Sequence, residues 1–270
     1  MYLSDYHVHT NISPDSQSDI IDMCQAAIDA GLHEIAFTDH LECGEVCETW
    51  QNNKRPFDLE KCLADLARAR EFCQDRLIIK NGIEIGQWLQ NPARAERLIK
   101  EMPLDFIICS LHCPDGFDDM YWVDYMADDI NEIIAAYAKE CADMAEASLD
   151  FDSLGHLTLP FRYGSRVRTD LTFDHCMDDI ERCFLGLIKR GIALEVNTSG
   201  VRCPLESMMP DMALMKWYKE LGGEFITIGT DAHKPEFVGA DIRAAQEFIL
   251  EAGFKSFVTF ENRKMIHHKI

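Results

Sequence analysis

Short apolar segments alternate with amphipathic segments along almost the whole chain, and this alternation most constrains the fold. Each apolar run of strand length precedes a stretch whose apolar residues recur every three or four positions, as on one face of a helix. A chain of such βα units folds around a mostly parallel sheet, either closed as a barrel or open. Seven strands are expected, at 2–6, 34–37, 77–85 and 106–109, in a short run ending at Gly155, and at 192–196 and 225–229.

The expected helices carry recognisable end signals. Ser18 can cap a helix over 20–28, because its hydroxyl accepts a hydrogen bond from a free N–H group of the first turn, and Gly31 can end that helix. Pro92 suits the first turn of another helix. The remaining helices are expected at 59–72, 130–144, 173–188, 212–221 and 240–250, with a further short strand at 257–259.

Length and composition narrow the class of protein. The 270 residues, 47% of them apolar, suit one barrel domain spanning 1–270. The chain has no apolar run long enough for a membrane span and no secretory leader, so we expect a cytoplasmic protein. The net charge of −21 disfavours nucleic acid as a partner. The 11 cysteines are scattered, which favours reduced thiols. The sequence does not specify an oligomeric state.

Residues that bind metal ions follow almost every expected strand. His7 and His9 are two positions apart, so on a strand they project from the same face. The carboxyl ends of the strands in a βα barrel meet at one face, which would gather these residues from distant parts of the chain. The set therefore predicts a metal-binding cup. Its members are His7, His9, Asp39, His40, Glu84, His112, His156, Asp231 and His233.

The number of candidate ligands indicates more than one divalent ion. A catalytic zinc ion takes about three protein ligands and a water molecule. Glu84 is a natural bridge, because its two oxygens can contact different ions. Asp15 lies in the loop after the first strand and can reach the same cup, although a helix cap or turn residue explains it almost as well.

Six short motifs resemble, in order, the motif set of the polymerase and histidinol phosphatase (PHP) superfamily. They are 7–10 (HVHT), 38–40 (TDH), 83–86 (IEIG), 110–112 (SLH), 155–156 (GH) and 229–233 (GTDAH). The resemblance implies a distorted (β/α)7 TIM-like barrel that holds three divalent ions, of zinc, manganese or iron. Many members have a histidine where this chain has Asp15. The implied ligand sets are His7, His9, Glu84 and Asp231 for one ion, Glu84, His112 and His156 for a second, and Asp15, His40 and His233 for a third.

Two further segments, 155–163 (GHLTLPFRY) and 195–200 (EVNTSG), are similar to the monofunctional histidinol-phosphatase branch of that superfamily. This similarity implies a phosphomonoesterase that converts L-histidinol phosphate to L-histidinol and phosphate in histidine biosynthesis. It places Arg162 near the substrate phosphate. Arg202 is a second candidate, equally well explained as a surface arginine paired with a carboxylate.

The expected chemistry is attack on phosphorus by a metal-bridging hydroxide, because divalent ions lower the pKa of bound water. Three such ions with Asp15, Glu84 and Asp231 would leave the site at about +3, which suits a phosphate dianion. Arg162 would share the charge that grows on the phosphoryl oxygens.

The leaving oxygen needs a proton or a metal ion, and three residues are candidates to serve it: Asp231, His233 and Asp39. Asp39 and His40 are adjacent, so on a strand they face opposite sides, and Asp39 is expected behind the ligands. Of the other histidines, His33 is expected to be structural, and His175, His267 and His268 to be solvated.

Acidic residues in the loops over the cup are candidates to bind the substrate ammonium, although a solvated acidic loop explains any single one of them better. Glu42 represents this group, whose members are Glu42, Glu45, Glu48, Asp115, Asp118 and Asp119.

Three other functions stay open. A PHP phosphoesterase for a nucleotide or sugar phosphate would have the same metal site. An amidohydrolase-like barrel would need a bridging lysine where this chain has Glu84. A non-catalytic metal-binding module would lack some of the ligands.

Overall fold

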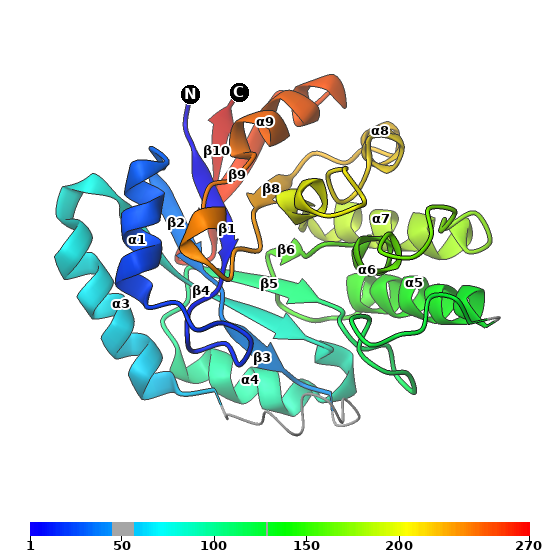
Figure 1. Ribbon diagram of the computed structural model, residues 1–270, viewed down its shortest axis with the longest axis horizontal. Coiled ribbons are helices and arrows are strands. Elements are labelled where there is room, and N and C mark those ends of the chain that lie inside the picture. The colour runs from blue at the N-terminus through cyan, green and yellow to red at the C-terminus, as the bar shows by residue number, and fades with distance from the viewer. Residues whose placement is uncertain (45–56, 128) are drawn as a thin grey trace.

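The strands of the central sheet are all parallel and follow the order of the chain. We describe a computed structural model for residues 1–44, 57–127 and 129–270. The sheet order is β1-β2-β4-β5-β6-β7-β8, with β3 also paired to β4. A parallel bridge between Val8 and Ala232 brings the last strand back to the first, so the sheet forms a nearly closed barrel (Figure 1). The strands are β1 Ser4–Val8, β2 Glu34–Phe37, β3 His40–Glu42, β4 Ile78–Gly86, β5 Phe106–Ser110, β6 Ser153–Leu154, β7 Ala193–Asn197 and β8 Ile226–Gly229.

The expected distorted βα barrel is confirmed. Part of the distortion is that the second strand of the barrel is interrupted. β2 and β3 both pair with β4, so they are two pieces of one interrupted strand. The interruption falls at Thr38 and Asp39. The register of β3 then sets His40 opposite Glu84, which brings two of the predicted ligands together.

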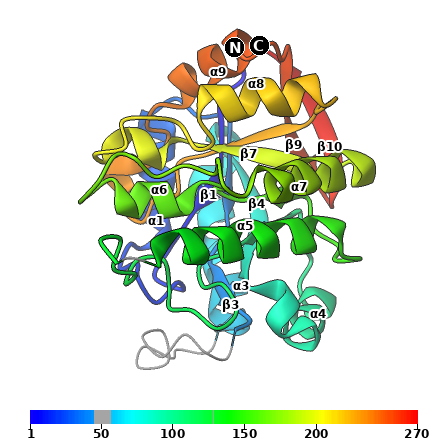
Figure 2. The same ribbon diagram turned by 90° about the vertical axis from the view of Figure 1, so that its right-hand side faces the viewer.

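Helices surround the barrel, and α5 and α7 lie side by side along one flank (Figure 2). No helix in the described ranges has both the length and the apolar character needed to cross a bilayer. Every cysteine that the structure describes is a free thiol, as expected. The helices are α1 Ile20–Asp29, α3 Leu59–Cys73, α4 Pro92–Glu101, α5 Ile130–Glu146, α6 Leu159–Gly164, α7 Met177–Arg190, α8 Met212–Glu220 and α9 Ile242–Glu251, with short 3-10 turns at Gln74–Arg76, Trp88–Gln90, Thr198–Arg202 and Pro235–Phe237.

Helix ends agree with the sequence in part. Pro92 occupies the first turn of α4, and Gly31, with φ of 74°, follows the end of α1, as expected. The predicted cap Ser18 is wrong, because Asp19 accepts the hydrogen bond from the N–H of Ile21 at 2.9 Å. The hydroxyl of Ser18 instead donates to a backbone carbonyl at 2.9 Å. The helix expected at 173–188 begins four residues later, at the start of α7.

A β-bulge in β1 changes the face on which its side chains project. Between its pairings with β2, β1 advances three residues, from Asp5 to Val8, while β2 advances two, from Ile35 to Phe37. Tyr6 and His7 are the two residues of the bulge, and Tyr6 packs among apolar side chains inside the barrel. The next residue, His7, projects toward the cup at the carboxyl ends of the strands. The bulge therefore separates the apolar floor from the polar cup, as bulges next to active sites often do.

An antiparallel hairpin of β9 (Ser256–Glu261) and β10 (Lys264–Lys269) covers the other end of the barrel. Its Phe260 packs with Tyr6 and Phe106, and the N–H of Phe260 donates to the Tyr6 hydroxyl at 2.8 Å. The sequence predicted the first of these strands but not the second. His268 is consequently not solvated as predicted, because its ring stacks on Tyr2 with centroids 4.0 Å apart.

Candidate metal centre

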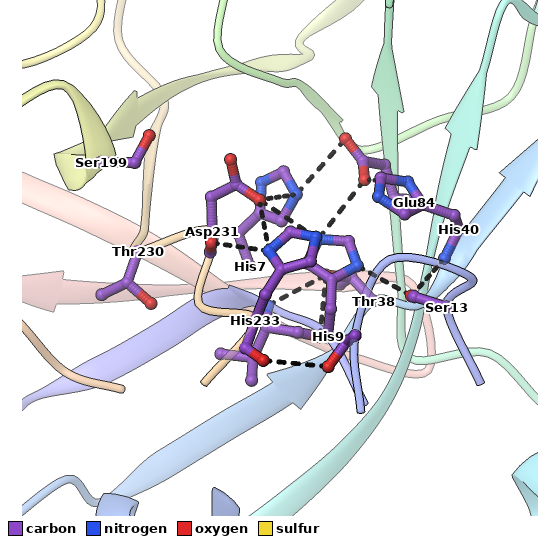
Figure 3. Close-up of polar contacts among 12 residues, drawn as sticks. His7, His9, Ser13, Thr38, His40, Glu84, Ser199, Thr230, Asp231 and His233 are labelled. Carbon is purple, nitrogen blue, oxygen red and sulfur yellow. Dashed lines mark hydrogen bonds and ion pairs between the residues drawn. The ribbon is translucent and has the colours of Figure 1, made fainter. Parts of the chain in front are cut away.

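The predicted cup is present at the carboxyl ends of the barrel strands. Figure 3 shows the imidazoles of His7, His9, His40 and His233 grouped between Glu84 and Asp231. His7, His9 and Glu84 have no exposed surface, and the other members are buried except His233, whose side chain is 23% exposed. Residues from β1, β3 and β4, and from the loops after β1, β5, β6 and β8, therefore meet in one place. They are His7, His9, His40, Glu84, His112, His156, Asp231 and His233.

Glu84 is the centre of this cluster, and its two carboxylate oxygens face different histidines. Oε1 lies near three imidazoles and Oε2 near two. A carboxylate placed in this way can contact two ions at once. The distances are 3.3, 3.3 and 3.0 Å from Oε1 to Nε2 of His7, His112 and His156, and 2.7 and 3.5 Å from Oε2 to Nδ1 of His40 and Nε2 of His9.

Asp231 and Asp15 border the cluster on its open side. Oδ1 of Asp231 lies 3.4 Å from Nε2 of His9 and 3.8 Å from Nε2 of His7. Oδ2 of Asp15 lies 2.9 Å from Nε2 of His233 and 3.6 Å from Nε2 of His40. The cap of α1 is Asp19, so the explanation of Asp15 as a helix cap is wrong, and its carboxylate reaches the cup.

Protein groups hold the outer nitrogen of several imidazoles, which turns the other nitrogen toward the centre. Such partners fix the ring orientation and the tautomer of ligating histidines. The carboxylate of Glu195 also accepts the backbone N–H of His156 at 2.7 Å. The partners of the Nδ1 atoms are Glu195 for His7 at 2.7 Å, Ser13 for His9 at 3.1 Å, Glu42 for His112 at 3.0 Å and the carbonyl of Asp231 for His233 at 3.0 Å.

Sequence reasoning assigned no role to Glu195 or Ser13. Glu195 lies in the segment 195–200, whose resemblance pointed to substrate specificity, and it is an acidic residue between apolar neighbours in a buried strand. The sequence therefore contained a signal that Glu195 has a role at the site. Ser13 offered none, because serine is common in loops and its contact with His9 depends on the course of the first loop.

Asp39 lies behind the ligands, as the alternation along a strand predicts. Its carboxylate accepts hydrogen bonds from the N–H and hydroxyl of Thr10 at 2.7 and 2.8 Å. It also accepts from the N–H and hydroxyl of Ser13 at 3.2 and 2.7 Å. Asp39 therefore fixes the first loop, which carries His9 and Ser13.

The donor atoms of the cup fit divalent cations. The buried atoms His7 Nε2 and His9 Nε2 make no hydrogen bond to any residue that the structure describes. Each such buried group costs about 1–3 kcal/mol when it is left unsatisfied, and a cation removes that cost. Imidazole with carboxylate suits zinc, iron and manganese. Three groups have donor atoms within 4.8 Å of one another: His7, His9 and Glu84; His9, His40 and His233; and His40, Glu84 and His112.

The electrostatics of the cup also require positive charge. Burial alone would raise the pKa of Glu84, but His7, His40 and His112 hold that pKa well below its ordinary value. Burial alone would lower the pKa of His7, yet Glu195 and Glu84 raise it well above the ordinary value. Burial, with His233 and His40, lowers the pKa of His9 to about 3. The carboxylates are therefore stable here only beside positive charge.

The cup opens into a cavity of about 590 Å³ whose wall carries several cations. Arg162, at the end of α6, places Nη1 2.5 Å from Oδ2 of Asp231. Arg202 donates to Thr198 Oγ1 at 3.0 Å, and its nearest recorded carboxylate, Asp241, is 3.9 Å away. Arg202 thus lines the cavity rather than forming a close surface pair. Arg166 and Lys234, which sequence reasoning missed, line the cavity as well.

The acidic loop residues separate into distinct environments. Glu42 faces His112 from within the cluster, and His112 and His40 hold its pKa down at about 2, although burial would raise it. The described part of the cavity lining includes Asp119 but not Glu42, so the structure does not place Glu42 where a substrate ammonium would lie. Asp115 and Asp118 are exposed. Glu45 and Glu48 lie outside the described residues. The exposed side chains His33, His175 and His267 lie away from the cup.

Known proteins resemble this chain over nearly its full length. A histidinol-phosphatase from Lactococcus lactis is 28% identical over 98% of this chain and 97% of its own. A protein from Deinococcus radiodurans, "Probable histidinol-phosphatase", is 29% identical over 97% and 98%. The solved histidinol phosphate phosphatase of L. lactis, complexed with zinc, L-histidinol and phosphate, is 27% identical and has a TM-score of 0.83, with 98% of each chain covered.

A family model for the PHP domain matches residues 5–199. That range includes all of β1 except Ser4, the strands β2 to β7 and the predicted ligands from His7 to His156. The match covers more than half of the sequence and bears out the resemblance to the PHP superfamily; it includes five of the six motifs, and the sixth, at 229–233, lies beyond it. The chain belongs to the PHP domain family.

Proposed function

We propose that this PHP protein is a metal-dependent phosphomonoesterase that hydrolyses L-histidinol phosphate to L-histidinol and phosphate. The observation that carries this proposal is the junction of a histidine and carboxylate cup with a cavity lined by arginines, in a chain that matches a phosphatase solved with histidinol and phosphate. The L-histidinol and phosphate bound to that solved relative are the reason for proposing histidinol phosphate as the substrate. The cavity of about 590 Å³ has room for a small phosphate ester.

The cup is proposed to hold three divalent ions of zinc, manganese or iron. When bound, such ions polarise phosphoryl oxygens and lower the pKa of water, which provides a nucleophile near neutral pH. The proximity of the donor atoms supports Glu84 as the shared ligand. The proposed sets remain His7, His9, Glu84 and Asp231, then Glu84, His112 and His156, and then Asp15, His40 and His233.

The expected net charge of the site changes once all its carboxylates are counted. Glu42 and Glu195 contact ligand imidazoles and add two negative charges to those of Asp15, Glu84 and Asp231. Three divalent ions would then leave about +1 rather than about +3. The arginines of the cavity wall become more important for attracting a phosphate dianion.

Arg162 and Arg202 are proposed to bind the phosphate. The guanidinium of Arg162 touches Asp231 at 2.5 Å, which holds it at the boundary between cup and cavity. Arg202 is tied to Thr198 and to the carbonyl of Thr230, so it also has a fixed direction. Guanidinium groups held in place in this way can share the charge on phosphoryl oxygens without reorganising during the reaction.

Asp231 and His233 are the proposed groups that pass a proton to the leaving oxygen, because both line the cavity. Asp231 is ionised in the charge count above, so it would first accept that proton from the attacking water. Asp39 was a third candidate. Its four hydrogen bonds to Thr10 and Ser13 support a positioning role instead.

The proposal is tested by measuring phosphate release from histidinol phosphate, a nucleotide and a sugar phosphate. We expect histidinol phosphate to have the highest kcat/KM, with activity lost on chelation and regained on addition of zinc, manganese or iron. A preference for a nucleotide or a sugar phosphate would replace the substrate but keep the reaction. Turnover that persists after metal analysis finds no bound ion would overturn the mechanism.

A further inference from the structure

A buried side chain helps to join the first and last strands of the barrel. Each other pair of neighbouring barrel strands forms a parallel ladder, whereas β1 and β8 share no ladder among the described residues. Beyond the end of β8, one bridge joins Val8 to Ala232, and the N–H of His9 donates to the carbonyl of Ala232 at 2.9 Å. Asp5, three residues before Val8, has no exposed surface and contacts the chain that leaves β8.

Both carboxylate oxygens of Asp5 accept hydrogen bonds from the loop that follows β8. Oδ1 accepts the N–H of Thr230 at 3.0 Å, and Oδ2 accepts the hydroxyl of the same residue at 2.5 Å. Oδ2 also accepts the N–H of Gly239 at 3.0 Å, so one side chain holds both ends of the segment 230–239. Oδ1 further accepts the N–H of His7 at 3.4 Å. Asp5 therefore fastens this loop to β1.

The fastened loop carries two of the proposed metal ligands, Asp231 and His233. Figure 3 shows Thr230, which Asp5 holds, next to Asp231. Asp231 has a φ of 54°, in the left-handed region that residues other than glycine rarely adopt, so its surroundings must hold it there. Its Oδ1 lies 3.4 Å from Nε2 of His9, which belongs to the chain that continues from β1. The hydrogen bonds of Asp5 thus connect the two parts of the chain that supply these ligands.

We propose that Asp5 is a positioning residue of the metal centre, which sets the place of Asp231 and His233 relative to His7 and His9. This inference rests on the proposed function, because it concerns the ions that the cup is proposed to hold. One proposed ligand set takes no residue from the loop after β8: Glu84, His112 and His156. Loss of the Asp5 contacts should therefore weaken the binding of the ions that use Asp231 or His233 and leave the ion of that set unaffected.

The test measures zinc binding by equilibrium dialysis and metal analysis, after chelation has removed the bound ions. Asp5→Asn keeps the shape of the side chain but replaces one acceptor oxygen with an NH2 group that would face a donor. We expect it to weaken the binding of one or two zinc ions about 10- to 100-fold, while at least one ion keeps its wild-type affinity. Thr230→Val removes only the hydroxyl donor and should weaken the same ions about three- to tenfold.

Asp152→Asn is the matched control. It also changes a buried aspartate whose carboxylate accepts a backbone N–H, that of Ile107 at 2.7 Å, but Asp152 lies outside the cup. This variant should bind zinc as the wild type does, so a loss confined to the Asp5 and Thr230 variants is not a general effect of disturbing the barrel.

Two results would overturn the inference while the proposed function stands. One is a zinc-binding curve of Asp5→Asn that coincides with that of Asp152→Asn. The other is an equal loss of affinity for every ion, which would mean that Asp5 supports only the fold. If Asp5→Asn does not fold, the curve of Thr230→Val decides by the same two criteria. A wild-type protein that binds neither zinc, manganese nor iron would overturn the proposed function and this inference together.

Discussion

At the scale of single residues, the candidate metal centre depends on which nitrogen of each imidazole faces inward. The sequence predicted these candidate ligands because they recur at strand ends, where the barrel topology gathers them. It did not predict the groups that orient them. Glu195 contacts His7 across 188 positions of the chain, and no local pattern encodes such a pairing. The sequence made Glu42 a candidate for binding the substrate. Its contact with His112 is also between residues far apart in the chain, so the sequence did not predict it.

The first residue-scale prediction concerns Glu195→Gln. The amide keeps the shape but not the charge that orients and polarises His7, so metal affinity should fall about 10- to 100-fold. Activity measured against metal concentration should shift to higher concentrations and recover when metal is in excess. Glu224→Gln changes an exposed glutamate and serves as the control. Superimposable metal titrations for the two variants would contradict the assigned role of Glu195.

A second prediction at this scale concerns Arg162→Lys. Lysine keeps the charge but loses the planar fork that can bind two phosphoryl oxygens, so kcat/KM should fall about 10- to 100-fold. Inhibition by inorganic phosphate should weaken in parallel. Arg168→Lys is the matched control, since Arg168 pairs with Asp170 and does not line the cavity. If Arg162→Lys resembles this control in both measurements, Arg162 does not bind the phosphate.

At the scale of secondary-structure elements, the alternation of side chains predicted that His7 and His9 share a face. It did not predict the bulge in β1 that includes His7. A bulge is defined by pairing with the neighbouring strand, here by three steps in β1 against two in β2. The sequence of β1 alone does not contain that register. The second strand of the C-terminal hairpin was missed because its exposed residues, such as Lys264 and His267, give it little apolar character.

The hairpin provides a prediction about pH. Nε of Arg263, at the tip of the hairpin, lies 2.5 Å from Oδ2 of Asp152. Burial raises the pKa of Asp152 to about 6 in spite of this contact. The folded state therefore binds more protons than the unfolded state between about pH 4 and pH 6, and stability from this group falls as pH rises through that range.

Asp152→Asn should remove that dependence. The unfolding free energy of the wild type minus that of the variant should decrease by at most about 3 kcal/mol between pH 4 and pH 7. The difference cancels effects of the metal centre, which both proteins share. Denaturant unfolding at several pH values measures it, and Asp150→Asn, whose side chain is 88% exposed, should show no trend. A difference that increases with pH would show that the contact with Arg263 outweighs burial.

At the scale of the whole molecule, the sequence predicted the seven-stranded barrel because every βα unit is visible in its apolar pattern. It also placed the cup, because parallel strands share one carboxyl end. The sequence did not predict the exact first residue of each helix or the division of the candidate ligands among ions. Both depend on three-dimensional contacts, such as the proximity of His40 to Glu84, Asp15 and His233 together.

The cup also links metal binding to the stability of the whole barrel, because its ligands come from strands distributed around the sheet. Ions that bind only the folded state stabilise it by about 2.7 kcal/mol at one hundred times Kd. In a chain of this size, removing them should lower Tm by about 5–10 °C. Differential scanning calorimetry before and after chelation measures the shift, with metal analysis of the same samples. His175→Gln, an exposed position outside the cup, should reproduce the wild-type shift, whereas His9→Gln should reduce it. An unchanged Tm in metal-free wild-type protein would mean that the buried carboxylates and imidazoles neutralise one another without ions.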